Sequence, residues 1–357
     1  MHVYENASWS HRATSWLRVN LFSSVWNTLA TLIFITFAIY LGSNAWQWGV
    51  ADAVWGKQPV KACNDAGGAG ACWAVVATKW RQMLFGIYPQ EEQWRPMLAV
   101  AAFCLMLVLS ALRFWWTLPR LLLLWAGGTA VSAWLMHGGL GLSVVRTELW
   151  GGLPITLMLA VFGTVLSFPF GILLALGRRS KLPIIRSLSI IYIELVRGVP
   201  LITVLFMAAV MFALFLPEGI TIDKLLRAQV AIILFNAAYA AEVVRAGLQA
   251  LPSGQTEAAD ALGLGYWKTQ RLVVLPQALK ITIPAQVNGF IDNFKDTSLV
   301  IVVSIFDFLY AVKQSVISDL EWRHYFVEAY LFAMAIYWIF CYAMSRYSQW
   351  LERHLSR

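Results

Sequence analysis

The stretch SGQTEAADALGLGYWKTQRLVVLP, residues 253–276, is a polar and glycine-interrupted segment in an otherwise apolar chain. Hydrophobic residues make up 59% of the 357 positions, and charged residues make up 13%. This apolar share exceeds that of an ordinary soluble domain, so several segments must be buried in lipid. The sequence therefore predicts an all-α polytopic membrane protein, in which residues 253–276 form a loop between two spans.

Charge-free runs locate the spans, because a helix needs about 20 apolar residues to cross the hydrocarbon. Four runs contain no charged residue; they lie between Arg18 and Asp52, Arg120 and Arg146, Glu148 and Arg178, and Arg197 and Glu218. Two shorter runs, 97–112 and 329–345, are bounded by arginines that can snorkel to the interface. Two further runs, 228–248 and 284–304, contain ionisable residues, which commonly mark a transport path. Together these runs predict about eight transmembrane helices.

The basic residues indicate how the chain is oriented. Although the formal net charge is +8, the Lys and Arg residues stand in short loops and not on one basic face. This pattern is typical of the positive-inside rule and argues against a nucleic-acid partner. Basic clusters occur before the first span, after the fourth and after the last. With about eight spans, all of these clusters lie on the same side of the membrane. Both termini are therefore expected to be cytoplasmic, with segment 43–96 outside.

Two of the four cysteines, Cys63 and Cys72, lie in the expected outer segment. An oxidising compartment there permits a disulfide, which the sequence favours over two free thiols. A zinc site is less favoured, because Asp65 is the only obvious further ligand near the two cysteines and no histidine lies in that segment. We therefore predict no metal site.

Residues 253–276 themselves are expected to form two short helices. Pro252 and Gly254 end the preceding helix, and Thr256 is positioned to cap a new one. Gly263 and Gly265 then interrupt it and predict a tight bend. Such a hairpin can rest on the membrane surface as an amphipathic element, or it can dock into another protein.

A spaced pattern in this stretch resembles the EAA loop of ABC importer permeases. It consists of Glu257-Ala258-Ala259, then Gly263, then Val273-Val274-Leu275-Pro276. The resemblance implies that residues 252–276, here called the EAA segment, form a coupling element that docks in a cleft of a cytoplasmic ATPase pair. The residues expected to carry this coupling are Glu257, Ala258, Ala259, Gly263, Leu275 and Pro276.

Further stretches resemble a narrower group, the permeases of polar amino-acid importers. The matching stretches are residues 192–206, 236–255 and 294–300. The resemblance implies a five-helix type I ABC importer core over 147–357. Residues 1–146, with NLFSS at 20–24, about three spans and the cysteine pair, resemble the extension of M-type permease subunits of general L-amino-acid ABC transporters.

This resemblance also implies partners and a location. The expected partners are a cytoplasmic ABC ATPase dimer that binds ATP and magnesium, a second homologous permease subunit, a periplasmic amino-acid-binding protein and the L-amino-acid substrate. The expected location is the inner membrane of a bacterium. The lipid bilayer is then the environment of every span.

The chain itself is not expected to be an enzyme or to bind a cofactor. A phosphate-binding P-loop ends in Gly-Lys-Ser/Thr, whereas Gly56-Lys57 is followed here by Gln58. The sequence also shows no nucleophilic triad. The alternative is an ion-gradient-driven secondary amino-acid transporter, for which inverted repeats would be expected but are not evident.

A polar stripe in the 284–304 run is the clearest internal indication of a substrate path. Asn288, Asp292, Lys295 and Asp296 recur on one helix face, with Thr297 and Ser298 close by. They are positioned either to contact the charged ends of an amino acid, or to pair with each other or with Glu242 and Arg245 and hold helices together. Asn236 and Tyr239, three residues apart on the preceding span, are hydrogen-bonding candidates for the same path.

Arg197, Gly198 and Pro200 predict a break in the fifth run. Pro200 cannot donate a backbone hydrogen bond and disfavours helix at the residue before it. The break can serve as a gate hinge, or it can mark the end of a membrane-surface helix over 184–196. Glu194 and Arg197 lie one turn apart and are expected to be able to pair.

Overall fold

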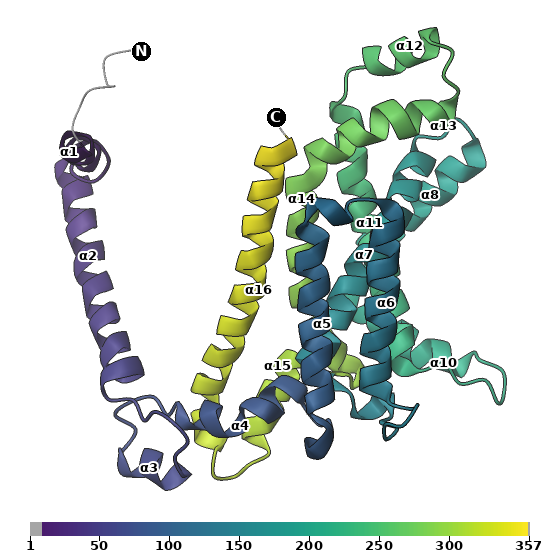
Figure 1. Cartoon of the computed structure of the whole chain (residues 1–357). Coiled ribbons are helices and arrows are strands. Elements are labelled where there is room, and N and C mark those ends of the chain that lie inside the picture. The colour runs from purple at the N-terminus through teal and green to yellow at the C-terminus, as the bar shows by residue number, and fades with distance from the viewer. Residues whose placement is uncertain (1–8, 356–357) are drawn as a thin grey trace. The chain divides into compact units, whose positions relative to one another are not determined.

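The computed structural model of the protein describes residues 9–355, which are mostly helical (Figure 1). The α-helices are α1 (Trp9–Asn20), α2 (Val25–Trp46), α3 (Val60–Asp65), α4 (Ala74–Phe85), α5 (Trp94–Ala111), α6 (Leu118–His137), α7 (Leu153–Arg178), α8 (Pro183–Arg197), α9 (Leu201–Phe206), α10 (Phe212–Leu214), α11 (Lys224–Ala250), α12 (Gly254–Ala261), α13 (Tyr266–Thr269), α14 (Leu275–Asp296), α15 (Phe308–Ile317) and α16 (Phe326–Leu355). Three π-helices continue α2, α9 and α13; they are η1 (Gln47–Ala51), η5 (Met207–Met211) and η6 (Gln270–Val274). The 3-10 helices are η2 (Gln90–Glu92), η3 (Arg113–Trp115), η4 (Thr147–Leu149), η7 (Thr297–Val303) and η8 (Arg323–Tyr325), and the strands are β1 (Gly151–Gly152) and β2 (Phe306–Asp307).

The chain divides into two compact units, the first ending at Thr78 and the second beginning at Lys79. In the first unit, Ser24 begins α2 because its Oγ accepts a hydrogen bond from the Asn27 amide at 3.2 Å. The loop after α2 contains a disulfide between Cys63 and Cys72, with a Cα–Cα distance of 5.7 Å. Both cysteines are buried, so the disulfide forms the centre of this small loop structure.

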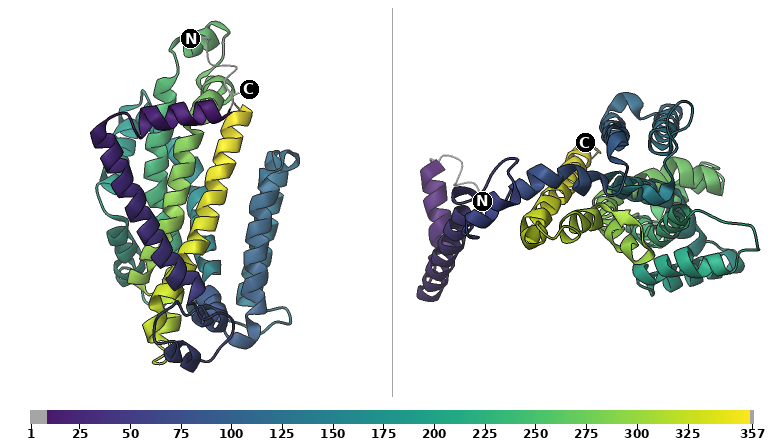
Figure 2. Two further views of the ribbon diagram at one scale, coloured as in Figure 1. Left: turned by 90° about the vertical axis from the view of Figure 1, so that its left-hand side faces the viewer. Right: turned by 90° about the horizontal axis from the view of Figure 1, so that it is seen from below.

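The second unit is built around α7, α11 and α14, which pack against one another (Figure 1). Small residues permit this approach: a Cβ at Gly171 would lie 2.7 Å from the Ala240 Cβ, and one at Gly247 would lie 2.4 Å from the Thr282 Cγ2. Close approach is how helices gain contacts in lipid, where no hydrophobic force drives them together. α16 packs beside α14, and α5 and α6 form a pair that contacts α7 (Figure 2).

The start of α7 is tied to the start of α15. Gly152 precedes α7 with φ 73°, a conformation that favours glycine. It pairs in parallel with Asp307, which is fully buried. The Asp307 carboxylate caps α15 by accepting hydrogen bonds from the amides of Leu309 and Tyr310 at 2.9 and 3.1 Å. This junction therefore sets the ends of two helices that are far apart in sequence.

The number of spans agrees with the prediction. Among residues 9–355, six helical stretches are long and apolar enough to cross a membrane; they are Val25–Ala51, Gln90–Ala111, Leu118–His137, Leu153–Arg178, Lys224–Ala250 and Arg323–His354. A further candidate is the pair formed by α8 and the α9–α10 arm, which is bent by 103°. α14 is a 22-residue helix that is less apolar but packs between α7, α11 and α16. The all-α fold with about eight spans is thereby confirmed.

The predicted boundary of one span is wrong. We expected a span from about Pro284, whereas α14 begins at Leu275 and continues directly from η6, with Pro284 inside the helix. Pro276 does not interrupt it, and it lies where the π-helix η6 changes to the α-helix α14. The α-helix ends at Asp296, and η7 continues the helical stretch to Val303, next to the expected end at Ser304. The EAA segment is therefore continuous with α14.

Candidate functional site

The EAA segment is a helical hairpin whose bend depends on one glycine. Gly263 follows α12 with φ 73° and donates a hydrogen bond to the Asp260 carbonyl at 2.9 Å. The next amide, of Leu264, donates to the Ala259 carbonyl at 3.1 Å. These two bonds form a Schellman motif, whose left-handed position favours glycine. Gly265 begins α13 with φ −70° and ψ 160°, which any residue adopts, so the predicted glycine bend depends on Gly263 alone.

The predicted cap of α12 is wrong. The helix begins at Gly254, directly after Ser253, whose side chain makes no capping bond. Thr256 therefore lies inside the first turn, where its hydroxyl is not placed as an N-cap. The cap was therefore expected three positions too late.

The hairpin presents large apolar side chains that no other part of residues 9–355 covers. Leu262 is 81% exposed and Trp267 is 68% exposed, and Tyr266 and Leu272 are exposed beside them. Figure 1 shows α12 and α13 projecting beyond the end of the helix bundle. An uncovered apolar cluster on a projecting element is typical of a protein-docking surface.

The predicted coupling residues divide between the outer face and the interior of this hairpin. Glu257 and Ala258 are exposed on α12, whereas Ala259 is buried, with 2% exposure. Leu275 is half-buried and Pro276 is exposed in the first turn of α14. The motif thus combines outward positions with one small residue that lets α12 pack.

The root of the EAA segment is packed into the helix bundle. Val274 and Ala278 belong to a buried cluster whose other members are Ala175, Leu176, Ile193, Ala241, Val244 and Leu248. This cluster joins η6 and α14 to α7, α8 and α11. Gln277 Nε2 also donates to Gln255 Oε1 at 3.1 Å, which links α14 to α12. A force on the exposed hairpin is therefore transmitted to four packed helices.

A charged network lies between α7, α8 and α11. Glu242 binds Arg178 at 2.7 Å and Arg245 at 2.8 Å, and Arg197 lies 3.6 Å from the same carboxylate. Glu194 binds Arg178 at 2.8 Å. The prediction that Glu194 is able to pair with Arg197 is thus not realised, because Arg197 turns toward Glu242. Glu242 is 14% exposed, so its charge depends on these arginines.

The predicted break between α8 and α9 is present. α8 ends at Arg197, Gly198 follows, and Pro200 begins α9 with φ −61° and ψ 141°. Because proline lacks an amide donor and disfavours helix at Val199, the two helices meet at 103°. The Arg197 guanidinium lies 5.7 Å from the ring centre of Tyr239, which ties the bend to α11.

The polar stripe of α14 is largely uncovered. Asn288, Asp292 and Lys295 are exposed, and Lys295 Nζ lies 2.9 Å from Asp292 Oδ1. Asp296 is half-buried, and the Thr297 side chain is buried and donates to the Phe294 carbonyl. A charged face on a helix at membrane depth does not face lipid, so it indicates a protein partner or a water-filled path.

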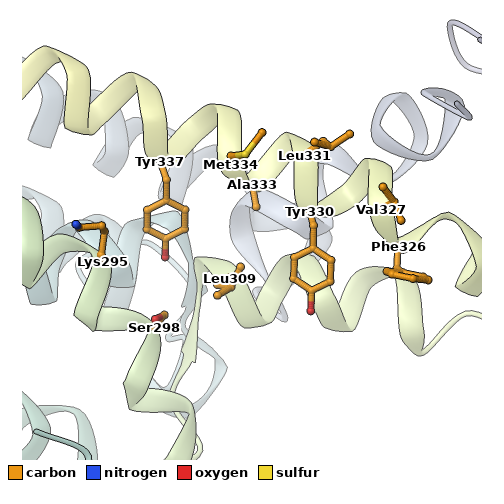
Figure 3. Close-up of a pocket in the computed structure, with 10 residues that line it drawn as sticks. All are labelled: Lys295, Ser298, Leu309, Phe326, Val327, Tyr330, Leu331, Ala333, Met334 and Tyr337. Atoms are coloured by element: carbon orange, nitrogen blue, oxygen red, sulfur yellow. The ribbon is translucent and has the colours of Figure 1, made fainter. Parts of the chain in front are cut away.

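A cavity of about 620 Å³ adjoins this stripe (Figure 3). Lys295 and Ser298 lie at one end with Tyr337, and Phe326 lies at the other (Figure 3). The remaining wall comes from α15 and from one face of α16. An apolar cavity with a cation and two hydroxyls at one end has the chemistry to hold a small amphipathic molecule.

Asn236 contacts α14 through Asn293, beside the polar stripe. Asn236 Nδ2 donates to Asn293 Oδ1 at 2.7 Å, and Asn293 Nδ2 donates to the Ala160 carbonyl and to Thr164 Oγ1, both at 2.9 Å. Asn293 is buried, with 4% exposure, and thus connects α7, α11 and α14. The sequence analysis did not single out Asn293, although it directly follows Asp292 and lies outside the stripe that Asn288, Asp292 and Lys295 form.

The chain is similar to known proteins in sequence and in fold. Residues 167–357 match the family described as binding-protein-dependent transport system inner membrane component. The chain is 50% identical over 352 residues to the inner membrane amino-acid ABC transporter permease protein YhdY of Escherichia coli (strain K12), covering 97% of this chain and 94% of YhdY. It is 39% identical over 411 residues to the glutamate/glutamine/aspartate/asparagine transport system permease protein BztC of Rhodobacter capsulatus, covering 97% of this chain and 94% of BztC. The crystal structure of an amino acid ABC transporter with histidines matches with a TM-score of 0.50 and 31% identity, covering 57% of this chain and 92% of that one.

Proposed function

Because the chain belongs to the binding-protein-dependent transport system inner membrane components, and among them to the amino-acid ABC transporter permeases, we propose that it conducts L-amino acids in an ATP-driven importer. It is a multi-pass inner-membrane permease with candidate spans along most of its length. The observation that carries the coupled mechanism is the EAA segment, with its exposed apolar surface and its packed root.

The EAA segment docks on a cytoplasmic ATPase dimer. Leu262 and Trp267 supply the large apolar contacts that dominate protein interfaces, and Glu257 lies on the same exposed helix pair. The chain has no Gly-Lys-Ser/Thr sequence at Gly56-Lys57, so ATP and magnesium are held by the ATPase partner. Among residues 9–355, no group of three or more His, Cys, Asp or Glu side chains is placed to hold a metal ion.

Closure of the ATPase pair moves the hairpin and, with it, the spans. The movement enters through η6 and α14, because Val274 and Ala278 are packed against α11. It reaches α8 through the Glu242 network, which connects α11 to Arg197 at the 103° bend. The open and the closed ATPase each favour one of two packings of these helices. Switching between the two packings opens the path first to one side of the membrane and then to the other.

Both termini lie on the cytoplasmic side in this proposal. The positive-inside rule supports it, and so does the end of α16, which lies at the same end of the second unit as α12 (Figure 1). A periplasmic amino-acid-binding protein then delivers substrate at the opposite end. The disulfide between Cys63 and Cys72 fits the oxidising compartment on that side.

The α14 stripe lines the substrate path together with a second, homologous permease subunit. An amino acid carries a carboxylate and an ammonium group, which Lys295 and Asp292 complement at a distance of 2.9 Å from each other. Substrate binding replaces the Lys295–Asp292 ion pair with two others, between Lys295 and the substrate carboxylate and between Asp292 and the substrate ammonium group. Neither side chain is then left unpaired. Asn288, Asp296 and Ser298 provide neighbouring polar contacts.

Uptake of labelled glutamate by cells that express this chain with its neighbouring subunits tests the proposal. Unlabelled aspartate, histidine, leucine, lysine and a sugar serve as competitors. Inhibition by every class of amino acid, but not by the sugar, supports a broad importer, whereas inhibition by aspartate alone narrows it to acidic substrates. A protonophore that leaves cellular ATP intact should spare uptake; loss of uptake would favour an ion-gradient-driven secondary transporter instead.

A further inference from the structure

A second large hollow, of about 820 Å³, lies between α8, the arm formed by α9, η5 and α10, and α11. We call it the α11 groove. Its wall is apolar and includes Met207, Met211, Phe212 and Phe235, and Arg227 is the charged member of its lining. Figure 1 shows α8 and α10 on the same side of α11, with α8 toward the EAA segment and α10 toward the opposite end.

Side-chain hydrogen bonds hold the walls of the α11 groove at both ends. Tyr192 of α8 donates its hydroxyl to the Leu234 carbonyl of α11 at 2.8 Å. At the other end, Arg227 Nη1 donates to the Ala209 carbonyl of η5. Both bonds join a wall to α11, so the hollow is preformed and a ligand loses little free energy in opening it.

Arg227 lies near a membrane boundary. α11 has 27 residues, and a helix of that length spans about 40 Å, more than the roughly 30 Å of the hydrocarbon core. Arg227 is one turn from the start of α11, at the end opposite the EAA segment. The groove positions Val230 and Leu234 continue from it along the helix toward the membrane centre.

We propose that the α11 groove binds an anionic phospholipid, with the phosphate at the Arg227 guanidinium and an acyl chain along the apolar wall. Charge complementarity supports this occupant, because the cation lies at the headgroup end of an otherwise apolar groove. Arg227 Nε is buried and has no hydrogen-bond partner among residues 9–355, so the guanidinium has donor capacity that the described residues do not use and that phosphate oxygens can take up. An apolar helix of a partner protein would leave that capacity unused.

Flexible side chains suit the groove to an acyl chain. Met207 and Met211 have several rotatable bonds and adapt to a chain without a fixed shape. Both lie on the arm that continues α9 after the bend at Pro200. A bound lipid therefore holds this arm against α11, on the side of the bundle where α8 carries Arg197 of the charged network.

Native mass spectrometry of the complete transporter, titrated with phosphatidylglycerol and with a neutral diacylglycerol, tests this proposal. Arg227→Gln should bind phosphatidylglycerol about 10-fold less tightly, the effect of losing one hydrogen bond to a charged group. Arg146→Gln removes an exposed cation from the same end of the bundle and should leave binding unchanged. Val230→Trp keeps Arg227 but fills the groove, and it should also weaken binding.

Equal affinity in the wild type, Arg227→Gln and Val230→Trp would overturn the proposal. Equal binding of phosphatidylglycerol and diacylglycerol by the wild type would do the same, since the phosphate would then contribute nothing. A cysteine at position 230, made by Val230→Cys, should react with a lipid-borne probe; its cross-linking to the second permease instead would assign the groove to a subunit interface. If Arg227→Gln fails to assemble, Val230→Trp and the cysteine experiment decide.

Discussion

Arg178, in the last turn of α7, lies 2.7 Å from Glu242 in the C-terminal half of α11. Each of the two has a further partner, since Arg178 also binds Glu194 at 2.8 Å and Glu242 also binds Arg245 at 2.8 Å. The pair stands beside the buried cluster in which the EAA segment is rooted. It therefore connects the root of the EAA segment with the bend between α8 and α9.

Replacement of Glu242 should be more damaging than replacement of any single arginine around it. Glu242→Gln leaves three arginines without their shared carboxylate, and we expect it to lower the free energy of unfolding by about 2 kcal/mol. Arg197→Gln should cost less than about 1 kcal/mol, because Arg197 is 37% exposed and 3.6 Å away. Thermal unfolding of the purified complex measures both, and a larger loss for Arg197→Gln would contradict the network described here.

Gly263 and Gly265 of the EAA segment should differ in how well they tolerate alanine. A Cβ at either position meets no atom of residues 9–355 within 4 Å, but Gly263 has φ 73° and Gly265 has φ −70°. Gly263→Ala should therefore lower the stability of the hairpin by about 1 kcal/mol and reduce ATP-driven uptake, whereas Gly265→Ala should have little effect.

A bulky charged residue at Gly263 extends this test. Gly263→Glu should leave the protein in the membrane but uncoupled, because the side chain obstructs both the bend and the docking surface. Uptake and ATP hydrolysis, compared at equal amounts of membrane protein, measure the coupling. Uptake by Gly263→Glu at the wild-type rate would show that this bend plays no part.

Trp267 should contribute to binding of the ATPase and not to the stability of the permease. It is 68% exposed, so Trp267→Ala should leave the unfolding temperature of the permease unchanged while weakening the ATPase complex by about 30-fold. Trp16→Ala is the matched control, since Trp16 is 58% exposed but lies outside the EAA segment. Affinity measured by surface plasmon resonance distinguishes the two; equal losses would exclude a specific role for Trp267.

The ion pair of Lys79 and Asp319, which are 2.6 Å apart, is expected to make a pH-dependent contribution to the free energy of unfolding. The hydrogen bond from Lys79 lowers the pKa of Asp319. A carboxyl group whose pKa is lower in the folded protein stabilises the fold at pH values above its pKa in the unfolded protein, near 3.9. This stabilisation is lost as the pH falls through the pKa of the folded protein.

This contribution should be less than about 1 kcal/mol, because both side chains are partly exposed. Thermal unfolding at pH 6 and at pH 3 should differ less in Asp319→Asn than in the wild type. Glu321→Gln, an exposed carboxylate two residues away, serves as the control. An identical pH response in the wild type and Asp319→Asn would exclude the linkage.

The sequence by itself determined the elements whose physics is local. Charge-free apolar runs of about 20 residues predict membrane-spanning helices wherever they occur. The bend at Gly263 follows from the conformational freedom of glycine. The break at Pro200 is equally local, because a missing amide donor ends a helix regardless of its surroundings. These features required no knowledge of which helices are neighbours.

Only the tertiary structure decided which charged and polar groups meet. Glu194 stands one turn from Arg197 and still binds Arg178, because the packing of α7 on α8 brings that arginine closer. Asn236 was expected on the same path as the α14 stripe, and its partner is Asn293, inside the bundle. Helix periodicity assigns a residue to a face, whereas the neighbour of that face depends on how small residues such as Gly171 and Gly247 let the helices approach.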